Sequence, residues 1–380
     1  MIPQQGTLEI SRSRLTHNIA ALRKQLPAKT KFCATIKADA YGHGVALLAE
    51  MLHEAGVEWT CVYSLEEALN LGGKRFAGIL VLSPLVLTAQ SQLPRAMLDA
   101  LRRSMRINLT DAASAKHLSR ILVEHGIIEP VNVHVQVDAG LTRMGIAPSD
   151  VVALTEVIAE LPLLRLEGIF AHLSHGDVPG HETLEQQWQV LHAAAQQLRP
   201  KHPELMVHLQ NSGGAFHVKE AAGKLDMARV GIAMYGLQPS TEDPVAGLLP
   251  IARLVAPILA IHERPAGVGV GYGHTFVTKR PTRLAIVPVG YADGYPRALS
   301  NRGVVQVRGQ DAPVVGRVSM DQIIVDVTDV GNVTVGEEVV VISWDAGRPN
   351  SVDAIADAIG TIGYEVTTHF GARLRRVVVE

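Results

Sequence analysis

Lys37 is the residue whose sequence surroundings suggest chemistry most directly. An apolar run at 32–36 ends at this single lysine, a glycine-flanked turn follows, and a helical pattern begins at His43. The pattern places one amine at the carboxyl end of a buried strand, where α/β folds carry their catalytic groups. A partly desolvated lysine in that position can form a Schiff base, and Tyr41 is near enough in sequence to reach a ligand phosphate. The alternative is a surface lysine that only ends a strand.

The elements that would position Lys37 alternate regularly up to about residue 235. Apolar runs predict eight strands, and helical patterns separate most of them. One helix, 65–71, begins with a capping box of Ser64 and Glu67. Eight strands with intervening helices are typical of a (β/α)8 barrel of the TIM type. The predicted strands are 32–36, 59–63, 79–82, 106–109, 131–137, 166–172, 206–210 and 227–230.

A doubly wound parallel sheet is the alternative fold. Such a sheet has fewer strands and a G-x-G-x-x-G turn after its first strand. The chain has no such turn there, and its glycine-rich stretch at 268–273 comes far too late. The sequence therefore favours the barrel, in which the carboxyl ends of all eight strands lie around one mouth.

Polar residues follow several of these strand ends and would meet at that mouth. They are Lys37 after the first strand, Arg143 after the fifth, His172 at the sixth, Asn211 and Ser212 after the seventh, and Arg229, Gly231 and Ile232 at the eighth. Barrels often bind a phosphate after strands seven and eight, and the Ser212 hydroxyl with the Gly231 and Ile232 amides suits that role. An imine-forming lysine opposite an anion cradle predicts pyridoxal phosphate (PLP) as the cofactor.

The character of the sequence changes near 244–250, which divides the chain into a barrel at 1–246 and a second domain at 247–380. Short β-branched runs at 254–261, 283–289, 304–308, 314–318, 323–327 and 338–342, with turns such as 308–311 between them, predict a mostly antiparallel β domain. One helix is expected at 352–359, with Ser351 as its N-cap. The early strand Thr7–Ile10 is expected to pair with this second domain.

Composition excludes several classes of function. The chain has 380 residues, 47% of them hydrophobic, and a net charge of −2, with no basic stripe to bind nucleic acid or a membrane surface. Cys33 and Cys61 both lie in apolar runs, which favours reduced thiols in a cytoplasmic protein. We expect no signal peptide, no apolar run long enough to span a bilayer, and no metal site, because no cluster has metal-ligand spacing.

Motifs in order over nearly the whole chain resemble those of the bacterial alanine racemase family. The segment K-A-D-A-Y-G-H-G at 37–44 resembles the PLP-lysine signature of that family. Further matching segments lie at 138–145, 168–177, 208–214, 228–236, 269–276, 289–297, 316–322 and 361–366. The resemblance implies a PLP barrel followed by a β domain, working as a head-to-tail homodimer with shared active sites.

The resemblance also implies two catalytic bases. Lys37 would bind the cofactor covalently and, once displaced by substrate, exchange the Cα proton on one face. Tyr272 is similar to the family's second base, which the other subunit contributes. Tyrosine is a poor base at its ordinary pKa of about 10, so it needs a cationic site and a partner, and His172 resembles that partner. The alternative for Tyr272 is packing within the β domain.

Other residues resemble groups that hold the cofactor or the substrate. Arg229 is similar to the arginine that faces the pyridine nitrogen, with His208 supporting it, although pairing with Asp226 is the alternative. Arg143 resembles the arginine at the cofactor's phenolic oxygen and at the substrate. The residues expected around the phosphate are Tyr41, Asn211, Ser212, Gly231, Ile232 and Tyr364.

Three residues of the second domain resemble groups that meet the substrate. Met320 is similar to the residue whose backbone N–H binds the substrate carboxylate, and Tyr291 and Asp321 resemble residues that support this site or its entrance. Ser319 replaces a cysteine that is frequent in the family beside Met320.

Gln136 departs from the family pattern, because better-studied members carry a carbamylated lysine there. Glutamine cannot be carbamylated, so the negative charge that would orient Arg143 is missing. We expect Arg143 to bind a chloride or another small anion, or to contact the Gln136 amide oxygen.

The resemblance implies racemisation of L- and D-alanine, for cell-wall precursors or for alanine catabolism. The alternatives are a racemase for serine or for a broad range of amino acids, and a PLP decarboxylase or aldolase of the same fold. Arg229 disfavours the decarboxylase, which carries a glutamate there, and the missing metal cluster disfavours the aldolase. A PLP carrier without catalytic function would lack the second domain.

Overall fold

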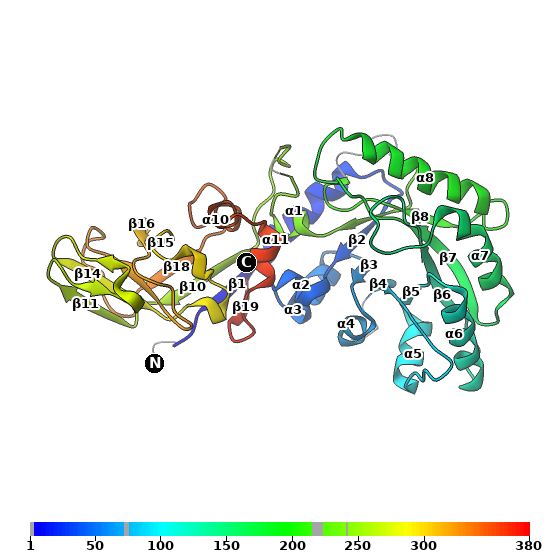
Figure 1. The fold of residues 1–380 in the computed structure, drawn as a ribbon, viewed down its shortest axis with the longest axis horizontal. Coiled ribbons are helices and arrows are strands. Elements are labelled where there is room, and N and C mark those ends of the chain that lie inside the picture. Colours follow the sequence, from blue (N-terminus) through cyan, green and yellow to red (C-terminus); the bar gives the residue numbers. More distant parts are fainter. Residues whose placement is uncertain (1–3, 72–75, 215–222, 241) are drawn as a thin grey trace.

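The computed structural model describes residues 4–71, 76–214, 223–240 and 242–380, which form a barrel and a β domain at opposite ends of an elongated molecule (Figure 1). The last helix and strand of the chain lie at the junction between these two parts. This arrangement confirms the fold class predicted from the sequence. The boundary predicted between residues 246 and 247 falls between the last described barrel element, which ends at Tyr235, and the first strand after it, which begins at Ala252.

Eight parallel strands form the barrel, in the order β8-β7-β6-β5-β4-β3-β2-β9. They are β2 (Lys31–Thr35), β3 (Trp59–Val62), β4 (Gly78–Pro84), β5 (Met105–Asn108), β6 (Val131–Gln136), β7 (Leu164–Phe170), β8 (Met206–His208) and β9 (Met227–Val230). The helical segments of this part are α1 (Arg12–Gln25), α2 (Lys37–Tyr41), α3 (Val45–Glu54), α4 (Leu65–Asn70), α5 (Arg95–Arg103), α6 (Ala112–Glu124), η1 (Pro148–Asp150), α7 (Val151–Glu160), α8 (Glu182–Leu198) and η3 (Ile232–Tyr235).

Backbone hydrogen bonds close the barrel where β8 and β9 meet. The Asp226 N–H donates to the Val207 carbonyl at 2.9 Å, and the Arg229 N–H donates to the Gln210 carbonyl at 3.0 Å. The Asp226 side chain also accepts from the Val207 N–H at 2.8 Å. Closure removes the exposed strand edges and places the last strand, β9, between β8 and the first strand, β2.

Sequence signals explain where the helices begin. Ser64 and Glu67 form the predicted capping box of α4, in which each side chain accepts from the other residue's backbone N–H. Asp111 accepts from the Ser114 N–H at the start of α6, and Ser351 caps the helix at 352–359. Each such cap stabilises its helix by about 1 kcal/mol. The apolar faces of strands and helices pack into one large core, with two smaller separate clusters.

The β domain contains a six-stranded sheet, a three-stranded sheet and a two-stranded hairpin, in the orders β16-β15-β18-β10-β1-β19, β11-β14-β17 and β12-β13. The first strand, β1 (Thr7–Ser11), runs antiparallel to β10 and parallel to β19. The other strands are β10 (Ala252–Pro257), β11 (Ala260–Arg264), β12 (Gly269–Val270), β13 (Phe276–Val277), β14 (Thr282–Val287), β15 (Val304–Val307), β16 (Gln310–Pro313), β17 (Ile323–Asp326), β18 (Glu338–Ile342) and β19 (Arg375–Val379). The helical segments are η4 (Tyr272–His274), η5 (Tyr291–Asp293), η6 (Arg297–Leu299), α10 (Val352–Ile359) and α11 (Gly363–Thr368).

Several local predictions for this domain were wrong. The turn expected at 308–311 is shorter, because Arg308 and Gly309 alone adopt positive φ and β16 starts at Gln310. The strand expected at 314–318 is reduced to a bridge between Val314 and Val325. Neither α11 nor β19 was expected from the sequence, and both contribute to the functional site described below.

Candidate active site

A cavity of about 450 Å³ opens at the carboxyl ends of the barrel strands. Its wall contains eight of the predicted site residues, together with residues of α11 from the β domain. The predicted residues are Lys37, Tyr41, His172, Asn211, Ser212, Arg229, Gly231 and Tyr364, and we call them the barrel-mouth group. The cavity lining that the sequence did not predict is Thr35, Ala38, Leu82, Ile362, Glu365 and Thr368.

The segment after Lys37 is a left-handed turn, not the simple turn expected from the sequence. Ala38, Asp39 and Ala40 all have φ between 53° and 54°, and Tyr41 has φ 55°. Non-glycine residues rarely adopt this region, so a run of four requires outside support. Side chains provide part of that support, since Glu67 accepts from the Ala38 N–H and Asp39 accepts from the Val45 N–H, both at 2.8 Å.

The residues expected to hold a phosphate meet at one wall of the cavity. The Ser212 hydroxyl accepts from the Gly231 N–H at 2.8 Å and from the Ala233 N–H at 3.4 Å. A Cβ atom on Gly231 would lie 2.5 Å from the Tyr41 hydroxyl, so only glycine lets that hydroxyl approach the backbone here. Ile232, the next residue, is fully buried and is not among the residues that line the cavity. Hydroxyl groups beside a glycine backbone suit a phosphate such as that of PLP, and Lys37 lines the same cavity.

Arg229 is buried at the base of the cavity and is held on several sides. Its Nη2 donates to the carbonyls of Ala171 at 2.8 Å and Leu209 at 3.3 Å, and lies 3.5 Å from His172 Nδ1. The alternative partner, Asp226, instead accepts from a backbone N–H. Burial lowers the pKa of Arg229, but a guanidinium remains protonated at neutral pH. The site therefore contains a fixed positive charge.

A chain of side chains runs from Arg229 through the barrel interior. Arg229 Nη1 lies 2.6 Å from His208 Nδ1, His208 Nε2 lies 2.9 Å from His134 Nδ1, and His134 Nε2 lies 3.0 Å from Glu167. Arg106 donates to both Glu167 oxygens. Arginine can only donate and a carboxylate can only accept. Both histidines are therefore neutral, with their protons on Nε2.

Electrostatics support this protonation pattern. Burial and the nearby Arg229 hold the pKa of His208 well below its ordinary value, and burial lowers that of His134. Burial alone would raise the pKa of Glu167, but hydrogen bonds from His134 and Arg106 hold it at about 2. His172 has a pKa of about 3, because of burial and the positive charges of Arg229, Arg143 and Lys37. Its neutral ring accepts from Arg229 on Nδ1, so Nε2 carries the proton.

Gln136 does not contact Arg143 in the way that the sequence suggested. Asn108 donates to the Leu82 carbonyl at 2.8 Å and accepts from the Gln136 N–H at 3.2 Å, which fixes the orientation of the Asn108 amide. Its remaining N–H donates to the Gln136 amide oxygen at 3.0 Å. Arg143 is exposed, and its guanidinium has no hydrogen-bond partner among the described residues. The contact expected between Arg143 and the amide oxygen is therefore absent from the described structure.

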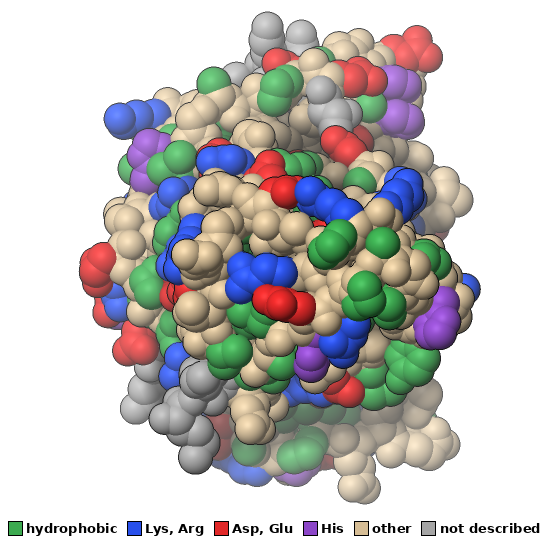
Figure 2. All heavy atoms as spheres, turned by 90° about the vertical axis from the view of Figure 1, so that its left-hand side faces the viewer, with side chains coloured by type: hydrophobic (Ala, Val, Ile, Leu, Met, Phe, Trp, Pro, Cys, Tyr) green, Lys and Arg blue, Asp and Glu red, His purple; other side chains and the backbone are tan. Residues whose placement is uncertain are grey.

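The remaining predicted residues lie on the β domain, away from the barrel mouth. Tyr272, Tyr291, Met320 and Asp321 line a separate recess of about 610 Å³, and we call them the β-domain face. Tyr272 is 72% exposed, Met320 52% and Tyr291 43%. Figure 2, viewed from the β-domain end of the molecule, shows hydrophobic side chains mixed with arginine and lysine side chains. One chain thus carries the predicted site in two separate pieces.

Tyr272 owes its exposure to the hairpin that carries it. It starts η4, between β12 and β13, and the glycines on both sides, Gly271 and Gly273, each have φ 69°. These positive φ values turn the chain sharply and leave the tyrosine at the tip. Its position favours contact with another molecule over packing within the domain.

In the described part of the chain, no group of three or more His, Cys, Asp or Glu side chains is arranged to hold a metal ion. No helix formed by these residues combines the length and apolar character needed to cross a membrane.

Comparisons with known proteins identify the family. Residues 10–239 match the model for the alanine racemase N-terminal domain, and residues 251–378 match that for the C-terminal domain. The chain is 38% identical over 374 residues to an alanine racemase of Desulfovibrio desulfuricans, covering 98% of this chain and 97% of that relative. It is 34% identical over 381 residues to the alanine racemase of a Synechocystis species, covering both chains completely.

Solved structures agree with these matches. The alanine racemase of Streptomyces lavendulae, a producer of D-cycloserine, has a TM-score of 0.88 and 30% identity, covering 100% of this chain and 98% of that one. The alanine racemase of Bacillus anthracis, solved with bound L-Ala-P, has a TM-score of 0.87 and 27% identity, covering 100% and 96%. The chain belongs to the alanine racemase family.

Proposed function

We propose that this protein interconverts L- and D-alanine with PLP as its cofactor. The observation that carries the proposal is that Lys37, the Ser212–Gly231 cradle and Arg229 line one cavity in a chain that matches both domain models of the alanine racemase family. PLP supplies an electron-withdrawing system that acidifies the Cα–H bond of an amino acid bound to it. The protein's task is to hold the cofactor and to move one proton between the two faces of Cα.

The barrel-mouth group would hold the cofactor at both ends. Lys37 would bind it covalently, and Ser212, Tyr41 and Tyr364 would surround its phosphate, with Asn211 and the Gly231 and Ile232 amides beside them. Arg229 would face the pyridine nitrogen. Arg229 donates a hydrogen bond to His208 and remains protonated, so it would leave the pyridine nitrogen without a proton. An unprotonated nitrogen would limit how much negative charge the pyridine ring can take up and would suppress side reactions such as decarboxylation.

Two bases on opposite faces would move the proton. The Lys37 amine serves one face of Cα, and the Tyr272 hydroxyl of a second copy serves the other. The neutral His172 ring presents Nε2–H, which can stabilise the phenolate by a hydrogen bond. We infer a head-to-tail homodimer, since the β-domain face is exposed in a single chain and Tyr272, the second base that the family resemblance implies, does not line the barrel cavity. In that dimer the Met320 N–H would bind the substrate carboxylate, beside Tyr291 and Asp321.

We also propose a chloride or another small anion beside Arg143. The Gln136 amide oxygen is already bonded to Asn108, so the N–H2 group of Gln136 is left to donate, and Arg143 has an uncommitted charge. Replacing all halide in the buffer with a bulky organic anion should then lower activity, and adding chloride should restore it. Equal activity in both buffers would contradict this role.

The experiment that tests the function is chiral chromatography of L-alanine incubated with the protein and PLP. D-alanine should accumulate until both enantiomers are equal. L-serine and L-arginine, run in parallel, separate an alanine-selective enzyme from the broad-specificity alternative. A decarboxylase would instead produce an amine, and an aldolase would produce glycine from L-serine.

We propose that the protein works in the cytoplasm, where its reaction would serve cell-wall synthesis or alanine catabolism.

A further inference from the structure

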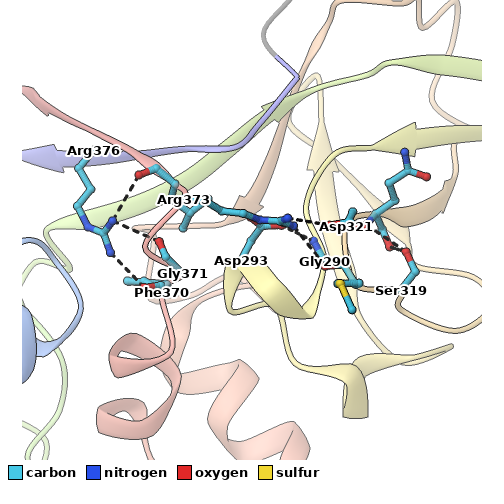
Figure 3. A network of polar contacts seen from close by, with 11 residues as sticks. Gly290, Asp293, Ser319, Asp321, Phe370, Gly371, Arg373 and Arg376 are labelled. Atoms are coloured by element: carbon cyan, nitrogen blue, oxygen red, sulfur yellow. Dashed lines mark hydrogen bonds and ion pairs between the residues drawn. The ribbon is translucent and has the colours of Figure 1, made fainter.

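Two arginines near the C-terminus contact different parts of the site. Arg373 precedes β19 and Arg376 lies within it, three residues later. Figure 3 shows their guanidinium groups on opposite sides of the turn at Phe370 and Gly371, with Arg373 directed toward Asp293 and Asp321 and Arg376 directed away from them. The two side chains therefore support different elements, although they come from one short segment.

Arg373 joins two turns of the β-domain face, the one that carries Tyr291 and the one that carries Met320 and Asp321. Its Nε and Nη2 donate to the two oxygens of Asp293 at 2.7 and 2.9 Å, and its Nη1 donates to Asp321 at 2.7 Å. Its Nη2 also lies 3.4 Å from the Met320 carbonyl. The two carboxylates raise the pKa of Arg373 further. A forked arginine pair of this kind fixes orientation as well as charge.

The same pairing sets the backbone around Met320. Asp293 is buried and accepts from the Gly290 N–H at 2.9 Å. The Tyr291 N–H donates to the Ser319 carbonyl, and the Ala292 N–H donates to the Met320 carbonyl, both at 3.0 Å. Arg373 thereby fixes the peptide that presents the Met320 N–H, although it does not reach the barrel mouth itself.

Arg376 supports the other piece of the site. Its Nη2 and Nε donate to the Gly42 carbonyl at 2.8 and 3.2 Å, at the end of the left-handed turn that follows Lys37. It also donates to the carbonyls of Phe370 at 3.1 Å and Gly371 at 3.2 Å. A Cβ atom on Gly44 would lie 2.7 Å from the Arg376 stem, so glycine makes room for it. This arginine thus holds the strained Lys37 turn against the C-terminal segment.

We propose that Arg376 positions the active site of its own barrel and that Arg373 positions the active site of the partner subunit. The proposal rests on the shared-site homodimer described under the proposed function. In that dimer the Lys37 turn serves the chain that carries it, whereas the β-domain face serves the neighbour. Two residues in one segment then act on two different sites, one in cis and one in trans.

Heterodimers with separate affinity tags on their two chains test this assignment. The reference pairs a Lys37→Ala chain with a Tyr272→Phe chain, which leaves one intact site. A Lys37→Ala chain with an Arg373→Met chain should match the reference, because the damaged face serves the dead barrel. A wild-type chain paired with a chain that carries both Lys37→Ala and Arg373→Met should be about 100-fold less active than the reference, as expected for a misplaced binding group. Its KM for alanine should also be raised.

Arg376→Met should give the reverse pattern. A heterodimer of an Arg376→Met chain and a Lys37→Ala chain should be impaired. Its only barrel that retains Lys37 is the one that has lost Arg376. When Arg376→Met and Lys37→Ala are in the same chain, opposite wild type, the activity should match the reference. PLP titrations of the homodimers give a readout independent of turnover. Arg376→Met should bind PLP more weakly, whereas Arg373→Met should bind it normally.

The outcomes distinguish a failure of this inference from a failure of the proposed shared-site homodimer. If the reference heterodimer itself is inactive, the shared site is wrong and both ideas fall. If the reference is active but Arg373→Met impairs both arrangements equally, Arg373 acts on the whole fold and the assignment fails. If the Arg373→Met chain does not fold, Arg373→Lys replaces it. Lysine keeps the positive charge but cannot form the two-pronged hydrogen bond to Asp293, so this variant should give the same pattern of activities in the heterodimers.

Discussion

The barrel mouth and the β-domain face differ in how their functional groups are held. At the barrel mouth, Arg229 is buried among carbonyls and a neutral histidine, and Lys37 directly precedes a strained turn supported by Glu67 and Arg376. On the β-domain face, Tyr272 stands exposed at a hairpin tip and Met320 on a surface turn. One piece is completed by its own chain, whereas in the proposed dimer the other would be completed by contact with a neighbour.

This difference suggests a division of labour between the two pieces. A deep site of fixed charge suits a cofactor that stays bound, because buried dipoles and charges act strongly at low dielectric. An exposed face that would meet the barrel only in the proposed dimer suits the groups that handle the small, exchanging substrate. Substitutions in the barrel mouth should therefore change cofactor binding and turnover together. Substitutions on the β-domain face should leave cofactor binding intact.

Lys37→Ala should have the largest effect. It removes the covalent attachment of PLP and one of the two bases, so racemisation should fall below detection and the protein should lose its yellow colour. Activity and the visible spectrum after PLP addition measure this directly. Lys31→Ala is the control, because Lys31 is an exposed lysine at the start of β2, the strand that precedes Lys37. It should change neither the activity nor the visible spectrum. Retained racemisation by Lys37→Ala would remove the basis of the proposed function.

Tyr272→Phe should come next, with a loss of about 100-fold or more, in the range of general base catalysis. PLP binding should remain normal, because Tyr272 does not line the barrel cavity. In heavy water, exchange of the Cα hydrogen should be slowed more for one enantiomer than for the other. Tyr63→Phe, at an exposed tyrosine of the barrel, serves as the control. Equal slowing for both enantiomers would argue against two bases.

The sequence predicted the barrel-mouth group better than the rest of the site. Lys37, Ser212 and Arg229 follow or end apolar strands, and barrel geometry alone brings such positions together. Tyr272 follows no such rule, since a hairpin tip carries no periodic signal, and only the family resemblance indicated it. The left-handed turn at 38–41 also had no sequence signal beyond its flanking glycines.

Long-range partners were the hardest to predict. The Gln136 amide oxygen is bonded to Asn108 on the neighbouring strand, and only the strand register reveals this pair. Likewise, Arg373 reaches Asp293 and Asp321 from 80 and 52 residues away. Such contacts depend on tertiary placement, whereas hydrophobic periodicity reports only local structure.

Glu167→Gln should have a smaller effect, of about 10-fold on turnover and about 1–3 kcal/mol on stability. The charge at the end of the histidine chain orders both histidine protons toward Glu167, so removing it lets the His134 and His208 tautomers mix. The 15N shifts of the two rings measure this change, together with kcat and the unfolding free energy. Glu156→Gln, in an exposed ion pair with Lys201, is the control and should be nearly silent. Unchanged 15N shifts would contradict the tautomer assignment.

His43→Asn should give the smallest effect, visible only in how stability depends on pH. His43 is buried beside the Lys37 turn, bonds the Ala40 carbonyl at 3.0 Å and stacks on Tyr235. Burial lowers its pKa from 6.5 to about 4. Between those values the unfolded chain binds a proton that the folded chain excludes, so the unfolding free energy falls as the pH falls.

That loss amounts to about 1.4 kcal/mol per pH unit for each such histidine. Asparagine keeps an N–H donor for the carbonyl but does not titrate. His43→Asn should therefore flatten the decline measured by urea unfolding between about pH 6 and pH 5, even where it lowers stability at neutral pH. His53→Asn, at an exposed histidine of α3, should leave the slope unchanged. An unchanged slope in His43→Asn would mean that His43 is already protonated in the folded barrel. The contrast between the buried barrel mouth and the exposed β-domain face would then fail, because the barrel mouth would not keep a buried histidine ring uncharged.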